Sequence, residues 1–158
     1  MIEWLRSRFR VAIFYARDWR NFLGCLADPN LHFKFGHYEL FGGESLPFFF
    51  VAKNLPINQI MVGDLPVGQT IQARRVREIL KNYPATPLAK VLEGRSAARV
   101  FELVDARMRG EDNFVVLCER TGRKKFQKID GATRLAVIKE TGGTTVNAVI
   151  TLRGQSRF

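Results

Sequence analysis

The chain has 158 residues and a formal net charge of +10, from 25 lysines and arginines against 15 aspartates and glutamates. Hydrophobic residues make up 46% and charged residues 25%, a balance that supports a packed core and excludes wholesale disorder. Cys25 and Cys118 lie far apart without a CxxC pair, which excludes a disulfide scaffold and a zinc finger and fits a reducing, cytoplasmic location. The positive charge favours anionic partners: nucleotides, nucleic acids, phosphorylated substrates or acidic lipids.

The first 27 residues predict an amphipathic helix that ends before Asp28-Pro29-Asn30. Aromatic residues, Trp4 and Trp19 among them, widen its apolar face, and arginines interrupt any signal-peptide core. Three alternatives remain for what the apolar face of residues 1–27 contacts. The face packs on the rest of the chain, or it pairs with a second copy in a homo-oligomer, or the helix lies on an anionic membrane as a peripheral helix.

The next segment has the pattern of strands. Alternating residues begin at His32 and His37 and predict a hairpin arm, with a turn at Gly42-Gly43. The apolar run at residues 48–51 predicts a buried strand or an interface patch, and it is too short to span a bilayer. The two histidines lack further ligands at suitable spacing, so we expect no metal site.

From residue 55 onward, strand and helix patterns alternate, which predicts an α+β domain at 55–158 after an extension at 1–54. The expected strands are Ile57–Val67, Asn113–Glu119, Lys124–Ile129 and Val146–Leu152, and the expected helices are Ile71–Tyr83, Leu88–Met108 and Asp130–Thr141. Gly142-Gly143 closes the last helix.

Between the last two of these elements lies a tight turn with phosphate-binding chemistry, the Asp130–Arg134 turn. Gly131 permits a positive φ or a close backbone approach, and the free amides at the start of a helix suit a phosphate. Thr133 can donate a hydroxyl, and Arg134 can place two donors on phosphate oxygens. Asp130 fits three roles: helix cap, metal holder through phosphates, or base. The alternative is that Asp130 is only an N-cap and Arg134 only a surface cation.

The sequence KIDGATRLAVIKETGG at Lys128–Gly143 resembles the DGxHRLxAxxxxG motif of the ParB/sulfiredoxin superfamily, and the resemblance covers residues 57–152. It implies a ParB-like small mixed sheet with packed helices. Ala132 stands where sulfiredoxins carry their reactive cysteine, so we expect no sulfinic-acid repair. Few residues follow this motif, so we do not expect the helix-turn-helix that chromosome-partitioning ParB proteins carry after it. It therefore looks most similar to the stand-alone free-serine-kinase branch.

That resemblance implies a nucleotide-dependent phosphotransferase, using ATP or ADP with magnesium on a small or surface-bound hydroxylated substrate. The nucleotide- and phosphate-binding residues it implies are Gly131, Ala132, Thr133, Arg134, Gln69, Thr70, Arg74 and Arg75. Gln69 falls near the branch's acidic position, and glutamine cannot accept the proton of an attacking hydroxyl. Either Asp64, Glu111 or Asp130 is the catalytic carboxylate, or the protein is a non-catalytic nucleotide-binding module that docks on a membrane or a protein partner.

A second basic feature lies on the predicted hairpin, where five cations fall within nine residues: Arg120, Arg123, Lys124, Lys125 and Lys128. They predict either a solubilising strand edge or contact with nucleic acid or lipid headgroups. A charge-driven nucleic-acid-binding protein is therefore a third hypothesis. The absence of a helix-turn-helix, an aromatic RNA platform or a zinc module argues against sequence-specific DNA recognition.

Overall fold

The computed structural model describes residues 2–39, 45–85 and 95–152. The helices are α1 Ile2–Ala27, α2 Ile71–Asn82, α4 Arg95–Met108 and α5 Ala132–Glu140, with 3-10 turns η1 Ile57–Gln59 and η2 Val67–Gln69. The strands are β1 Leu31–Glu39, β2 Ser45–Pro56, β3 Ile60–Val62, β4 Leu65–Pro66, β5 Val115–Gly122, β6 Lys125–Asp130 and β7 Thr145–Leu152. The α+β class is confirmed. The predicted turn at Gly42-Gly43 and the first residues of the predicted helix at 88–108 lie outside the described residues.

The strands form one mixed sheet in the order β1-β2-β7-β5-β6-β3-β4. The pairs β5–β7 and β3–β6 are parallel, and the other neighbours are antiparallel. The expected division between residues 54 and 55 falls inside β2, where Ala52 pairs with Ala148 and Leu55 pairs with Val146 of β7. The aromatic extension and the α+β segment therefore share one sheet.

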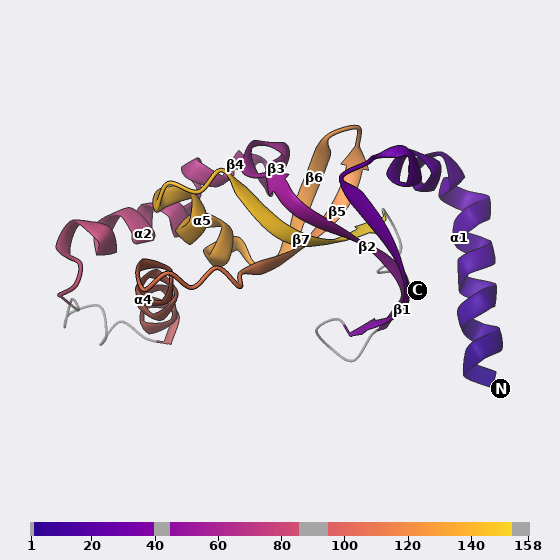
Figure 1. Cartoon of the computed structure of the whole chain (residues 1–158), viewed down its shortest axis with the longest axis horizontal. Coiled ribbons are helices and arrows are strands. Elements are labelled where there is room, and N and C mark those ends of the chain that lie inside the picture. Colours follow the sequence, from indigo (N-terminus) through magenta and orange to yellow (C-terminus); the bar gives the residue numbers. More distant parts are fainter. Residues whose placement is uncertain (1, 40–44, 86–94, 153–158) are drawn as a thin grey trace.

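Three helices gather at one end of this sheet, and α1 stands at the other end (Figure 1). Helix α5 is buried on two sides: Leu135 and Ile138 pack in the core of the sheet, while Ala136 and Val137 pack with α2 and α4. A helix that is apolar around most of its circumference belongs in a core. This burial fixes α5, and with it the turn that precedes it.

The segment predicted as one strand at 57–67 is not continuous. The chain forms η1, then β3, then turns at Gly63-Asp64 and returns as β4, so that Met61 pairs with Pro66. Gly63 has a φ of +61°, a left-handed conformation that favours glycine. The Gly63-Asp64 pair is a sequence signal for such a two-residue reversal, and the prediction of a single strand was wrong.

Among its described side chains, those of helix α1 that pack on the sheet lie near its C-terminal end. Phe22 is buried with its ring edge-on to Phe48 and Phe50, at centroid distances of 5.7 and 5.8 Å, and Cys25 is buried beside it. Within the described part of the chain, none of the helices combines the length and apolar character needed to cross a bilayer. The last turns of α1 therefore dock on the rest of the chain.

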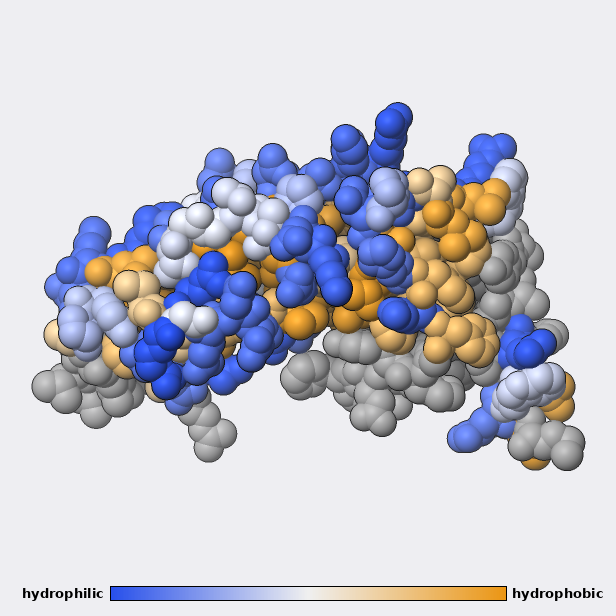
Figure 2. Space-filling model, viewed as in Figure 1, coloured by the Kyte–Doolittle hydropathy of each residue, from blue (hydrophilic) through white to orange (hydrophobic). Residues whose placement is uncertain are grey.

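The basic hairpin cluster needs one correction. Arg120 is buried, and its guanidinium donates to the side-chain and backbone oxygens of Asn21 in α1. Arg120 shares a face of β5 with the buried Cys118, two residues before it, because side chains alternate along a strand. Arg123, Lys124 and Lys125 are exposed, and hydrophilic side chains project at the tip of the β5–β6 hairpin (Figure 2).

Candidate functional site

The Asp130–Arg134 turn joins the end of β6 to the start of α5. Gly131 is the N-cap residue, with φ 99° and ψ 27°, and its carbonyl accepts the first helical hydrogen bond from the Leu135 amide at 2.9 Å. A Cβ at this position would lie 2.8 Å from Cγ1 of Val116 in β5. Both expectations for Gly131, positive φ and close approach, are confirmed, and either one alone selects glycine.

Because the cap residue is a glycine, the start of α5 has no side-chain cap hydrogen bond. The amides of Ala132, Thr133 and Arg134 precede the first intrahelical bond and have no acceptor within the helix. All three residues are partly exposed. Three N–H groups without a helical acceptor and the positive end of the helix dipole therefore lie at a partly exposed helix start, the kind of position that phosphates occupy in other proteins.

Asp130 does not cap the helix, so that interpretation was wrong. Its side chain is 45% exposed, and one carboxylate oxygen lies 4.0 Å from Nη1 of Arg134. At this distance the pair is a weak surface ion pair. The carboxylate thus lies at the rim of the turn, facing water beside the guanidinium.

Arg134 is fixed in place. Its Nη1 donates to the carbonyl oxygen of Val115 at 2.8 Å, and its side chain is 34% exposed. The bond to the strand holds the planar guanidinium beside the helix start and leaves Nε and Nη2 outside that bond. An anchored guanidinium loses less entropy when it binds an anion than a free surface side chain does.

The second group of expected phosphate-binding residues lies elsewhere. Gly68 in η2 sits against Lys139, and Arg77 of α2 bonds both the Gly68 carbonyl (3.0 Å) and Glu140 (2.8 Å). Lys139 and Glu140 form the last turn of α5, about 13 Å along this nine-residue helix from Gly131. The structure therefore separates Gln69, the adjoining residue of η2, from the Asp130–Arg134 turn.

The side chains around this corner have different roles. Thr70 is buried and caps α2: its hydroxyl accepts from the Ala73 amide at 3.2 Å and donates to the Val67 carbonyl at 2.7 Å. Gln69, Arg74 and Arg75 are exposed. The hydroxyl of Thr70 is committed to the fold, whereas the two arginines face solvent on α2.

The three candidate carboxylates lie on different segments of the fold. Asp64 lies exposed in the β3–β4 turn, and Glu111 lies after α4, 3.6 Å from Arg109. Asp130 is the candidate that lies at the phosphate turn. Within residues 2–39, 45–85 and 95–152, no cluster of three or more histidine, cysteine, aspartate or glutamate side chains could hold a metal ion.

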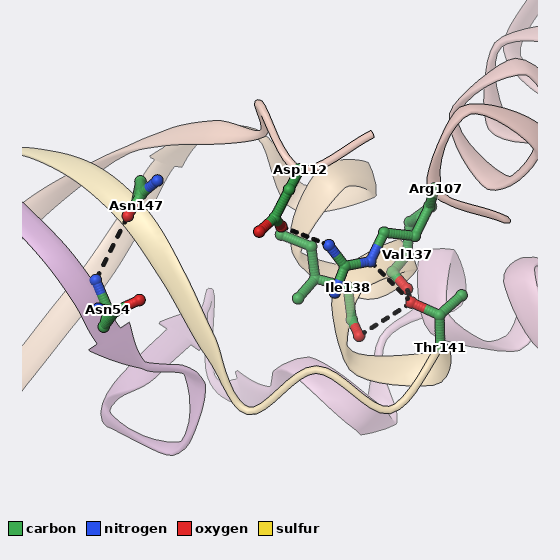
Figure 3. A network of polar contacts seen from close by, with 7 residues as sticks. All are labelled: Asn54, Arg107, Asp112, Val137, Ile138, Thr141 and Asn147. Carbon is green, nitrogen blue, oxygen red and sulfur yellow. Dashed lines mark hydrogen bonds and ion pairs between the residues drawn. The ribbon is translucent and has the colours of Figure 1, made fainter. Parts of the chain in front are cut away.

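A polar hollow of about 270 Å³, which the sequence did not predict, lies at the opposite end of α5. It is lined by Asn54, Arg107, Asp112, Phe114, Ile138, Gly142, Gly143, Thr144, Thr145, Val146 and Asn147. Arg107 bonds Asp112 at 2.5 Å and Thr141 at 3.4 Å (Figure 3). Because Nε and Nη1 of Arg107 already donate hydrogen bonds to protein side chains, we assign the arginine a structural role in the wall of the hollow.

Sequence reasoning missed this hollow because segments far apart in the chain assemble it. The Asn54 amide, for example, donates to the side-chain oxygen of Asn147 at 3.3 Å, across the β2–β7 pair (Figure 3). The residue that could have indicated the hollow from the sequence is Gly143, where a Cβ would lie 2.4 Å from Cγ2 of Ile138. A glycine pair after a helix indicates a tight connection, but it does not indicate what the connection faces.

Burial makes both cysteines poor nucleophiles. Desolvation raises the pKa of the Cys118 thiol to about 12, against a weaker opposing effect of the Lys128 charge. Cys25 is fully buried. We expect a thiol reagent at pH 8 to leave both cysteines unmodified in the native protein and to titrate both after denaturation.

The same pKa gives a pH dependence. The thiol of Cys118 stays protonated in the folded state above its ordinary pKa of 9.0, where the unfolded chain releases the proton. Its contribution to stability is complete below pH 9 and falls as the pH rises toward 12. Rapid modification of the native protein at pH 8 would contradict the burial of these thiols.

Comparisons of the chain with protein-family models, curated proteins and solved structures found no match.

Proposed function

We propose that the protein binds a nucleotide, ATP or ADP, through its phosphates at the Asp130–Arg134 turn. The observation that carries the proposal is the glycine cap of α5. Gly131 adopts a left-handed conformation against Val116, and the partly exposed residues that follow it have no side-chain cap for their amides. Buried on two sides, α5 holds these amides in a fixed direction.

The guanidinium of Arg134 adds a charge to the amides. Hydrogen bonds between ionised groups are shorter and about twice as strong as neutral ones. Arg134 is held by the Val115 carbonyl, so its remaining donors need little reorganisation on binding. The net charge of +10 raises the local concentration of anionic ligands around the whole molecule.

Phosphoryl transfer to a small hydroxylated substrate is a second candidate function, and the position of Asp130 favours it. Asp130 lies at the rim of the turn, whereas Gln69 lies beside the far end of α5. In this arrangement the catalytic carboxylate is Asp130, so glutamine at position 69 does not exclude catalysis. Asp130 is the residue that would hold a magnesium ion carried by the nucleotide, and that ion would supply neutralisation of the phosphate charge. The resemblance to the free-serine-kinase branch of the ParB/sulfiredoxin superfamily points to the same activity.

The binding proposal is tested by calorimetric titration with ATP and ADP, with and without magnesium. We expect Arg134→Ala to weaken binding by about 10- to 100-fold, because charge-assisted hydrogen bonds contribute about 1.5–3 kcal/mol. Arg134→Lys keeps the positive charge but lacks the planar guanidinium. Its nucleotide affinity should lie between those of the unaltered protein and Arg134→Ala.

Arg123→Gln is the matched control, because it removes one exposed arginine charge away from the turn. It should bind nucleotide as the unaltered protein does. Circular dichroism of Arg134→Ala without ligand checks that the loss of the Val115 bond leaves the fold intact. Equal nucleotide affinity in Arg134→Ala and Arg123→Gln would reject the turn as the phosphate site.

An assay of nucleotide turnover with product analysis separates the two candidates. Nucleotide-dependent phosphorylation of a hydroxylated substrate supports the phosphotransferase. Binding without any turnover across a panel of hydroxylated substrates supports a binding module.

A further inference from the structure

Helix α1 exposes an apolar stripe that no part of the described chain covers. Trp19, Leu23 and Leu26 follow one another at i, i+4 and i+7 and are 51%, 50% and 49% exposed. Their neighbours Phe22 and Cys25 face the sheet and are buried. The last turns of α1 therefore have one apolar face that packs in the core and a second one, the α1 stripe, that faces solvent.

Exposed apolar side chains are concentrated on this end of the molecule. Of the 13 large exposed hydrophobic residues in the described chain, eight belong to α1 and β1: Ile2, Trp4, Leu5, Trp19, Leu23, Leu26, Phe33 and Phe35. Figure 2 shows hydrophobic side chains gathered over β1, β2 and the end of α1. Single exposed apolar residues need no explanation, but the group Trp19, Leu23 and Leu26 on one face of the helix indicates an interaction surface.

Arginines accompany the aromatic residues of this surface. The guanidinium of Arg8 lies 4.3 Å from the ring centre of Trp4, and that of Arg20 lies 5.5 Å from the ring centre of Trp19. Over its length, α1 has five arginines against one glutamate and one aspartate, an excess of three positive charges. A second copy of the helix would bring the same excess of charge to the interface, whereas an anionic surface complements it.

We propose that α1 and the edge strand β1 dock on the surface of an anionic lipid bilayer. Tryptophan and leucine side chains of the α1 stripe enter the boundary between headgroups and acyl chains, and the arginines contact lipid phosphates and carboxylates. Tryptophan favours this depth because its ring is apolar and its indole N–H is polar. The inference rests on surface composition and does not depend on nucleotide binding.

The chain provides its own probe for this proposal. It contains two tryptophans, Trp4 and Trp19, and both lie in α1. Intrinsic tryptophan fluorescence therefore reports on this helix alone. We expect vesicles of phosphatidylcholine with about 30 mol% phosphatidylserine to shift the emission to shorter wavelength, and the full-length protein to float with them in a gradient. Pure phosphatidylcholine should give a much smaller effect, and high salt should weaken binding.

Two variants test the surface. Leu23→Glu places a charge in the exposed α1 stripe and should abolish flotation. Ile71→Glu places the same charge on another exposed apolar residue, in α2, and should bind vesicles normally. Circular dichroism and thermal unfolding of both variants check that the fold is intact.

Several outcomes would overturn the proposal. A blue shift that grows with protein concentration without vesicles, together with sedimentation as a dimer, would assign the surface to a second copy of the chain. Equal binding to neutral and anionic vesicles would contradict the proposed contact between the arginines and anionic lipids. An unchanged emission and no flotation would exclude docking on the bilayer.

Discussion

Gly131→Ala is expected to lower the free energy of unfolding by about 2–5 kcal/mol. A residue with a Cβ in the left-handed region costs about 1–2 kcal/mol, and overlap with a packed neighbour costs about 1–3 kcal/mol. Both costs apply here, because Gly131 has a φ of 99° and its Cβ would lie 2.8 Å from Val116. Chemical denaturation with linear extrapolation measures the change.

Gly142→Ala is the matched control for this prediction. Gly142 has a φ of +91°, but a Cβ there would meet nothing within 4 Å. Gly142→Ala should lower the free energy of unfolding only by the cost of a left-handed backbone with a Cβ, about 1–2 kcal/mol. Val116→Ala in the Gly131→Ala background should recover part of the difference. If the two glycine variants lose the same stability, Gly131 does not pack tightly on Val116 and the turn has been described wrongly.

Phe22→Ala is expected to cost about 3–5 kcal/mol, the range for removing a large side chain from a core. Phe22 is buried and its ring packs edge-on against three others, Phe33, Phe48 and Phe50, at centroid distances of 5.7–5.9 Å. Its ring joins α1 to β1 and β2. The measurement is again equilibrium denaturation, combined with limited proteolysis at the arginines of α1.

Leu23→Ala, at the next residue, should change stability by less than about 0.5 kcal/mol, because Leu23 is half exposed. The pair thus compares the buried and exposed faces of one helix turn. Faster proteolysis of α1 in Phe22→Ala alone would confirm that this ring anchors the helix. Similar stability of the two variants would contradict the packing of α1 on the sheet.

The sequence predicted the elements that depend on local patterns. The ends of the predicted helix Ile71–Tyr83 and of the predicted strand Val146–Leu152 differ from those of α2 and β7 by at most one residue. Hydrophobic periodicity and helix-ending residues determine these ends, and both are local features of the sequence. The Asp130–Arg134 turn was recognised because a left-handed glycine between a strand and a helix has a residue-level signature. The cap of α5 was not assigned correctly, since Asp130 and Gly131 are both acceptable N-cap residues.

Several features that sequence reasoning missed depend on contacts between distant segments. Arg120 turns inward because Asn21, 99 residues earlier, accepts its hydrogen bonds. Gln69 was grouped with the Asp130–Arg134 turn by resemblance, yet the packing of η2 against Lys139 places it at the other end of α5. Spacing along the chain does not determine which end of a helix a preceding loop contacts.

A nucleotide titration followed by backbone amide NMR tests the proposed phosphate site most directly. With ATP and magnesium added to the full chain, the account predicts the largest shift changes at the amides of Ala132, Thr133 and Arg134, at the start of α5. Larger changes at Gly142–Thr145, in the hollow at the other end of the helix, or no saturable change at all, would contradict it.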